Sequence, residues 1–213
     1  MKALVGRVCS AVDPLRVGVL VSGSGSNLQA LLDRQAGSLY RVVVVVANVA
    51  GAFALTRAKD AGVAAVVEGH QGITREAHEA RVQVHLEQHQ VELLVLGGYM
   101  RVLSPWLVGQ WRRRIVNVHP ALLPSFPGMH AAKQALDHGC RVAGCTVHLV
   151  ADGVDTGPIL SQAAVPIHDH DDEASLQRRI QNEEHRLLPQ VVEAYAAGKV
   201  VDVEGRVRCC ALS

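Results

Sequence analysis

The feature that most constrains the fold is a continuous apolar run at residues 42–47, five valines followed by an alanine. A run without polar alternation predicts a strand buried on both faces, and such strands belong to parallel sheets covered by helices on each side. The run is far shorter than the roughly 20 residues that a membrane helix needs. The sequence therefore predicts an α/β protein built around this strand.

Apolar runs alternate with helix-patterned segments along most of the chain. Strands are expected at 16–21, 41–47, 63–67, 91–96, 114–118, 144–150 and 159–165, and helices at 26–36, 51–61, 74–90, 131–138 and 172–197. A terminal hairpin is expected at 200–203 and 206–209, split by Glu204-Gly205. This alternation predicts right-handed βαβ units in a doubly wound, mostly parallel sheet. We expect one domain over residues 16–213, after an extension of residues 1–15 that has no assigned role.

Composition excludes several classes of function. Lys and Arg number 21 against 20 Asp and Glu, so the basic excess that a polyanion-coating protein needs is missing. Aromatic residues make up 3%, which disfavours binding of single strands by base stacking. The N-terminus has no continuous apolar stretch typical of a secretory signal, and five cysteines without metal-type spacing favour reduced thiols. We therefore expect a cytoplasmic protein whose partners are small molecules, not nucleic acid or a membrane.

The loop after the first strand, Ser22–Asn27, is predicted to bind a phosphate. Its glycines let the backbone approach a ligand, and the following helix presents free N–H groups to an anion. The dinucleotide fingerprint fails because Leu28 stands at its third glycine, and the second strand ends in Ala47-Asn48 without an acid for a ribose. A tight turn without a ligand is the alternative.

Three polar residues suit carbonyl chemistry. Asn117 and His119 lie two apart at the end of an apolar strand, so their side chains leave the same face. An amide can hold a developing oxyanion while an imidazole moves a proton. Asp155, in a glycine-rich loop, would orient His119 and stabilise its imidazolium form. The alternatives are a hydrogen-bonded pair that closes the strand and an ordinary turn aspartate.

Further candidates lie on the helices. Glu184 falls on the apolar stripe of the long helix, where a carboxylate needs either a ligand or an internal hydrogen bond. His78, His85 and His89 are expected on a solvated helix face. The run 168–172, His-Asp-His-Asp-Asp, offers either metal ligands or, as we favour, caps for the long helix.

At this point the motifs SGSGSNLQA, YMRVLSP, IVNVHPALLPSFPGMHA, GCTVHLV and DGVDTGPIL show a close resemblance to the glycinamide ribonucleotide formyltransferases. The resemblance covers the chain from about Arg16 to Tyr195. It implies the formyltransferase fold with a Rossmann-like N-terminal half. It also implies transfer of a formyl group from 10-formyltetrahydrofolate to glycinamide ribonucleotide in purine biosynthesis, without a metal.

The resemblance also implies roles for matching positions. The ribonucleotide would contact Gly25, Ser26, Asn27 and Glu184. The folate would contact Arg75, Met100, Arg101, Val102, Leu103 and Asn117. The catalytic residues would be Asn117, His119 and Asp155. One departure is Ala151-Asp152, where relatives often carry Asp-Glu, and it matters little if that loop binds folate through its backbone.

Alternatives remain at the level of function. Methionyl-tRNA formyltransferases resemble this core but add a C-terminal domain, and formyltetrahydrofolate hydrolases add an N-terminal one; we expect neither addition here. A non-catalytic phosphate-binding module would keep Ser22–Asn27 but would have no use for Asn117 beside His119. Whether the chain is a monomer or a homodimer stays open.

Overall fold

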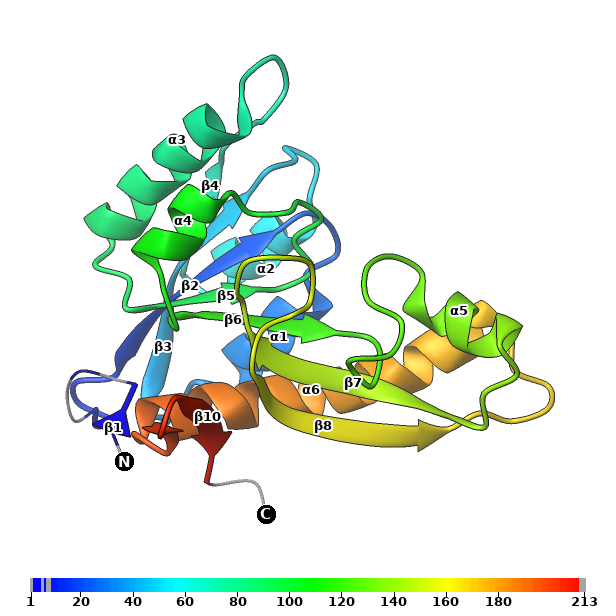
Figure 1. Ribbon diagram of the computed structural model, residues 1–213. Coiled ribbons are helices and arrows are strands. Elements are labelled where there is room, and N and C mark those ends of the chain that lie inside the picture. The colour runs from blue at the N-terminus through cyan, green and yellow to red at the C-terminus, as the bar shows by residue number, and fades with distance from the viewer. Residues whose placement is uncertain (1, 5, 7–8, 211–213) are drawn as a thin grey trace.

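The computed structural model describes residues 2–4, 6 and 9–210, and it is built on a seven-stranded sheet (Figure 1). The strand order is β4-β3-β2-β5-β6-β7-β8. Its strands are β2 (Leu15–Val21), β3 (Tyr40–Ala47), β4 (Ala64–Val67), β5 (Leu93–Leu96), β6 (Ile115–His119), β7 (Val142–Leu149) and β8 (Ile159–Pro166). The pairs from β4 to β6 are parallel, whereas β6–β7 and β7–β8 are antiparallel. The predicted mostly parallel sheet is confirmed.

Helices cover both faces of this sheet, as a doubly wound fold requires. They are α1 (Ser26–Arg34), α2 (Ala54–Asp60), α3 (Arg75–Gln88), α4 (Pro105–Gln110), α5 (Ala131–Asp137) and α6 (Glu173–Ala196). Side chains of α1, α2, α5 and α6 share one buried cluster with the sheet. Those of α3 and α4 share a second cluster on the opposite face.

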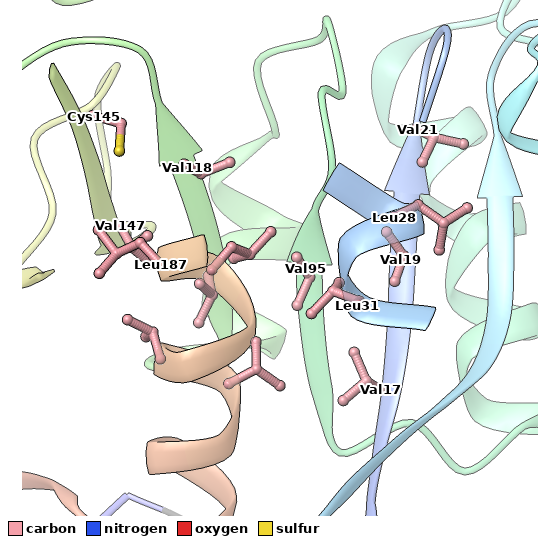
Figure 2. Close-up of a cluster of buried hydrophobic side chains, with 14 of the residues drawn as sticks. Val17, Val19, Val21, Leu28, Leu31, Val95, Val118, Cys145, Val147 and Leu187 are labelled. Atoms are coloured by element: carbon pink, nitrogen blue, oxygen red, sulfur yellow. The ribbon is translucent and has the colours of Figure 1, made fainter. Parts of the chain in front are cut away.

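The larger cluster lies where α1 and α6 cross the sheet (Figure 2). Val17, Val19 and Val21 of β2 all point to this face, because alternate residues of a strand point the same way. Leu28 and Leu31 of α1 lie beside them, and Leu187 of α6 lies beside Val147 of β7 in the same cluster. The residues between them on β2, such as Leu20, face the second cluster, so the strand is apolar throughout. This packing fixes the position of β2 in the sheet. It therefore also fixes where the loop Ser22–Asn27, which follows β2, begins.

A second, three-stranded sheet joins the two ends of the described chain. β1 (Lys2–Ala3) and β10 (Arg206–Cys209) both pair with β9 (Val200–Val203) in antiparallel fashion. The expected hairpin at 200–209 is confirmed, but the pairing of β1 was not expected. Within the described part of the chain, no helix combines the length and apolar character needed to span a membrane.

One side-chain expectation is wrong. His78 is fully buried rather than solvated, because its helix packs that face on the sheet and its Nε2 lies 3.0 Å from the Glu68 carbonyl. Burial lowers the pKa of His78 further than the Glu68 contact raises it. The expectation for Asp172 is confirmed: its carboxylate accepts from the Ser175 amide at 2.7 Å and caps α6.

Candidate functional site

A cleft of about 690 Å³ opens at the carboxyl edge of the parallel strands. Leu20 of β2 lies beside Leu96 of β5, which lies beside Asn117 of β6, so the loops after these three strands start at one level. All three loops line the cleft, together with the loop after β7 and one face of α6. Ligands of open parallel sheets bind at this edge. The structure therefore brings together most of the residues that the sequence singled out.

The loop Ser22–Asn27 forms one wall and is held against α2. Gly25 has φ of 70°, and a Cβ there would lie 2.6 Å from the Cβ of Ala54. The Ala54 amide donates to the Gly23 carbonyl at 3.1 Å, and Arg57 Nε donates to the Ser24 carbonyl at 2.9 Å. Only glycine combines the left-handed backbone with this close approach. These contacts with α2 hold the loop in a tight turn, and α1 begins directly after it.

Asn27 and Glu184 form a buried polar pair beneath that loop. Asn27 Nδ2 donates to Glu184 Oε2 at 2.9 Å, so the internal hydrogen bond considered for Glu184 exists. Burial raises the pKa of Glu184, and the hydrogen bond from Asn27 lowers it by less. Asn27 Oδ1 is buried and has no hydrogen-bond partner among the described residues. An unsatisfied buried oxygen at the cleft wall is a group that a ligand donor would complete.

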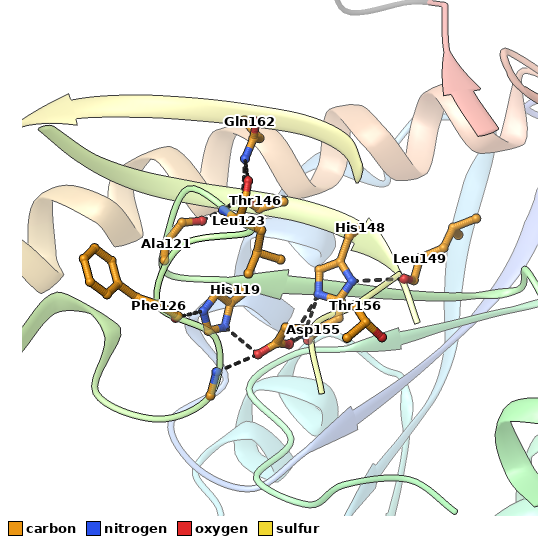
Figure 3. A network of polar contacts seen from close by, with 12 residues as sticks. His119, Ala121, Leu123, Phe126, Thr146, His148, Leu149, Asp155, Thr156 and Gln162 are labelled. Atoms are coloured by element: carbon orange, nitrogen blue, oxygen red, sulfur yellow. Dashed lines mark hydrogen bonds and ion pairs between the residues drawn. The ribbon is translucent and has the colours of Figure 1, made fainter. Parts of the chain in front are cut away.

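Asp155 is the centre of the polar network at the floor of the cleft (Figure 3). Its Oδ2 lies 3.3 Å from His119 Nδ1 and accepts from the Gly128 amide at 2.9 Å, and its Oδ1 lies 3.5 Å from both Asn117 Nδ2 and His148 Nε2. Burial alone would raise the pKa of this carboxyl, but the hydrogen bonds from His148 and Gly128, with the two imidazoles, lower it below its usual value. Asp155 is therefore a charged group at neutral pH.

Asn117 owes its orientation to His148, a residue to which the sequence analysis gave no role. His148 Nδ1 lies 3.0 Å from the Leu149 carbonyl, which orients the ring so that its Nε2 faces Asn117 and Asp155. That nitrogen lies 3.1 Å from Asn117 Nδ2. An amide nitrogen carries two hydrogens, and the second contact of Asn117 Nδ2 is the longer one to Asp155 Oδ1.

His119 is held between two acceptors. Its Nε2 lies 2.8 Å from the Phe126 carbonyl, and its Nδ1 faces Asp155 (Figure 3). A ring that is protonated on both nitrogens satisfies both contacts, whereas a neutral ring satisfies one.

The loop that supplies the Phe126 carbonyl is itself fixed from β7 and β8. Thr146 Oγ1 donates to the Ala121 carbonyl at 2.6 Å, and Gln162 Nε2 donates to the Leu123 carbonyl at 2.9 Å.

The segment Met100–Leu103 forms another part of the cleft wall. Met100 and Val102 expose 66% and 53% of their surface, although both are apolar and line the cleft. The segment ends at Ser104, whose amide donates to the buried carboxylate of Glu79 at 2.8 Å and whose hydroxyl also bonds to that group. Arg101 and Leu103 line the cleft as well. Arg75, by contrast, is exposed at the start of α3 and lies outside the lining.

Known proteins match this chain over most of its length. The sequence profile of the formyl transferase family matches residues 15–192. The chain belongs to the formyl transferase family. A phosphoribosylglycinamide formyltransferase of Escherichia coli is 38% identical over 189 residues, which cover 87% of this chain and 89% of that protein. The crystal structure of glycinamide ribonucleotide transformylase 1 from Symbiobacterium toebii superposes with a TM-score of 0.89 at 46% identity, covering 92% of this chain and 94% of that one.

Longer proteins also match this chain. The trifunctional purine biosynthetic protein adenosine-3 of Drosophila pseudoobscura pseudoobscura is 47% identical over 188 residues, 86% of this chain. The chain spans only 14% of the length of that relative. The similarity therefore concerns one part of a larger protein in that case.

The described residues hold no group of three or more His, Cys, Asp or Glu side chains placed to bind a metal. The run 168–172 is occupied otherwise: Asp171 pairs with Arg179 at 2.6 Å, and Asp172 caps α6.

Proposed function

We propose that this chain transfers the formyl group of 10-formyltetrahydrofolate to the amine of 5'-phosphoribosylglycinamide, a step of purine biosynthesis. The observation that carries the proposal is the meeting of Asn117, His119 and Asp155 between a phosphate-type loop and an apolar wall. The similarity to formyltransferases of this substrate supports it. The name of the longer trifunctional relative also refers to purine biosynthesis.

Each substrate has a wall of the cleft suited to it. The amides of Gly25, Ser26 and Asn27 lie at the N-terminus of α1, where a phosphate is favoured by free N–H groups and the helix dipole. Glu184, on the same side, would accept from ribose hydroxyls or the amine. Met100, Arg101, Val102 and Leu103 offer apolar surface and backbone to the fused ring of the folate, with Asn117 at its inner end. Arg75 would reach the folate only at its outer, acidic end.

The reaction exchanges one C–N bond for another. The amine attacks the formyl carbon, which forms a tetrahedral adduct with a negatively charged oxygen. Asn117 Nδ2 would donate to that oxygen in place of its longer contact with Asp155, and the positive charge of a protonated His119 would stabilise it. Asp155, ionised and beside His119, stabilises the imidazolium and assists removal of the amine proton. The adduct then collapses by breaking the bond to N10, which takes up a proton. Holding both substrates in one cleft supplies much of the remaining rate.

A formyl-transfer assay tests this function. The chain is incubated with 10-formyltetrahydrofolate and either glycinamide ribonucleotide or water alone as the acceptor. We expect release of tetrahydrofolate that depends on the ribonucleotide and yields an equal amount of formylated product. Release at the same rate without ribonucleotide would instead show a hydrolase. Binding of the ribonucleotide without any transfer would show a phosphate-binding module.

A further inference from the structure

Ser22 connects the two walls of the cleft through its hydroxyl. This serine opens the loop Ser22–Asn27, yet its Oγ accepts from the Met100 amide at 2.8 Å, 78 residues away in sequence. Its own amide donates to the Gly98 carbonyl at 3.2 Å. One residue thus bonds on both sides of Tyr99 to the strand end that leads into Met100–Leu103. The loop and the apolar wall are therefore linked by backbone and side chain at the same point.

Asn48 fixes the direction of that link. The Ser22 hydroxyl donates its single proton to Asn48 Oδ1 at 2.7 Å, which leaves its oxygen lone pairs for the Met100 amide. Asn48 is buried, and its backbone N–H donates to the Val21 carbonyl at 3.3 Å. Its Nδ2 lies 3.4 Å from His70 Nδ1. In a dinucleotide-binding protein, an acid at the position of Asn48 would hold a ribose. Here Asn48 instead orients the hydroxyl of Ser22.

We propose that Ser22 is a positioning residue that couples the two substrate walls, so that a ligand at Gly25–Asn27 strengthens binding at Met100–Leu103 and the reverse. This inference rests on the proposed function. A phosphate held by the amides of Gly25 to Asn27 fixes the loop three residues beyond Ser22. The position of the Ser22 hydroxyl is then fixed too. Because the Met100 amide donates to that hydroxyl, the segment Met100–Leu103 is held in position as well. The second ligand meets a wall that is already in position.

Coupling of this kind is reciprocal and can be measured as one factor. The dissociation constant of tetrahydrofolate is measured by calorimetry without and with saturating glycinamide ribonucleotide, and the ratio of the two is the coupling factor. This pair of ligands carries no formyl group, so no reaction disturbs the equilibrium. We expect a factor of about five or more in the parent chain, at the lower end of typical coupling between sites.

The decisive variants differ by one hydroxyl. Ser22→Thr and Ser22→Val have side chains of nearly equal shape, but only threonine keeps the hydroxyl. We expect the factor to persist in Ser22→Thr and to fall below about two in Ser22→Val and Ser22→Ala. Asn48→Ala keeps the serine but removes the acceptor that orients its proton, and should lower the factor without abolishing it. Ser38→Ala, which removes an exposed hydroxyl bonded to the Arg34 carbonyl, is the control and should leave the factor unchanged.

The outcomes separate two failures. If both ligands bind the parent chain and the factor is near one, or is equal in the threonine and valine variants, the coupling role of Ser22 is wrong and the proposed function stands. If neither ligand binds the parent chain, the proposed function fails and the coupling falls with it. A variant that merely lost stability would weaken each ligand alone, which the single-ligand measurements reveal. Should the valine and alanine variants not fold, Asn48→Ala decides.

Discussion

At the scale of single residues, Asp155 carries the most contacts in the site, and its charge can be removed without changing its shape. Asp155→Asn keeps a side chain that tolerates the left-handed backbone found there, where φ is 54°. It removes the negative charge opposite His119 Nδ1. We expect turnover to fall by about a hundredfold or more, as loss of acid–base assistance usually causes. Steady-state kinetics with saturating substrates measure this, and calorimetry should show ribonucleotide affinity within about threefold of the parent.

Asp155→Asn should also change how the stability of the fold depends on pH in acid. Because the pKa of Asp155 is lowered below its ordinary value of 3.8, the ionised carboxylate stabilises the fold. That contribution is present above the ordinary pKa and is lost as pH falls through the lowered value. Asp155→Asn should therefore flatten the acid limb of the stability–pH curve below about pH 4 in urea unfolding. An unchanged acid limb would show that the carboxylate gains nothing from its neighbours.

Glu184 presents the opposite case, a charge that the fold disfavours. Burial raises its pKa above the ordinary 4.5, so the folded protein binds the proton more tightly than the unfolded chain. The charged form then opposes folding above the raised pKa, and stability increases as pH falls toward 4.5. Glu184→Gln keeps an oxygen for Asn27 but removes the charge. We expect Tm at neutral pH to rise by about 2–4 °C, which corresponds to roughly 1 kcal/mol in a domain of this size. Calorimetry should show weaker ribonucleotide binding in the same variant, and lower stability would contradict the argument.

At the scale of elements, the close approach of loop and helix at Gly25 can be separated from its backbone conformation. Gly25→Ala adds a Cβ against Ala54 of α2, whereas Gly37→Ala adds one in open space at nearly the same φ, 76° against 70°. Both should lose stability from the left-handed conformation. Only Gly25→Ala should move the loop, so its affinity for glycinamide ribonucleotide should fall at least about tenfold, or 1.4 kcal/mol. Calorimetry on both variants tests this, with tetrahydrofolate alone as the control ligand. An equal loss of ribonucleotide affinity in both would assign the effect to global destabilisation.

Most helices and strands could be predicted from the sequence, but α4 and β1 could not. The valine run of β3 predicts a strand because it is short and its residues are β-branched, and the apolar stripe of α6 predicts a helix because its spacing repeats over many residues. Helix α4 has six residues, too few for a period, although Ser104-Pro105 is a typical helix start. Strand β1 has two residues and owes its pairing to β9, which lies at the other end of the chain. Contacts between distant segments leave no local pattern.

At the scale of the whole molecule, the same limit explains which parts of the site could be predicted. Asn117 and His119 follow from one strand, and the level of the loops follows from parallel pairing. His148 enters the site because β7 runs antiparallel to β6 and places it opposite Asn117. The direction and register of a strand cannot be predicted from its own residues. His148 could therefore be placed in an apolar strand but not beside Asn117. Asn48 and Ser22 meet for a similar reason, since β3 lies beside β2.

The two buried clusters of the molecule should differ in their effect on the site, although each contains a leucine of similar burial. Leu15 begins β2 at the amino edge of the sheet, in the cluster with α1 and α6. Leu107 holds α4 in the other cluster, and its amide donates to Ser104 Oγ at 3.3 Å, where the segment Met100–Leu103 ends. Replacing either by alanine should lower the free energy of unfolding by about 2–5 kcal/mol, the usual cost of a buried leucine.

Binding then distinguishes the two variants under conditions where urea curves show both to be folded. In Leu107→Ala, α4 can shift into the space that the leucine leaves, and Ser104 shifts with it. The apolar wall then loses its fixed end, so we expect tetrahydrofolate affinity to fall severalfold. In Leu15→Ala the cavity lies at the edge of the sheet away from the cleft, and affinity should match that of the parent. Equal loss of affinity in both variants would mean that the wall depends on overall stability and not on the anchoring of α4.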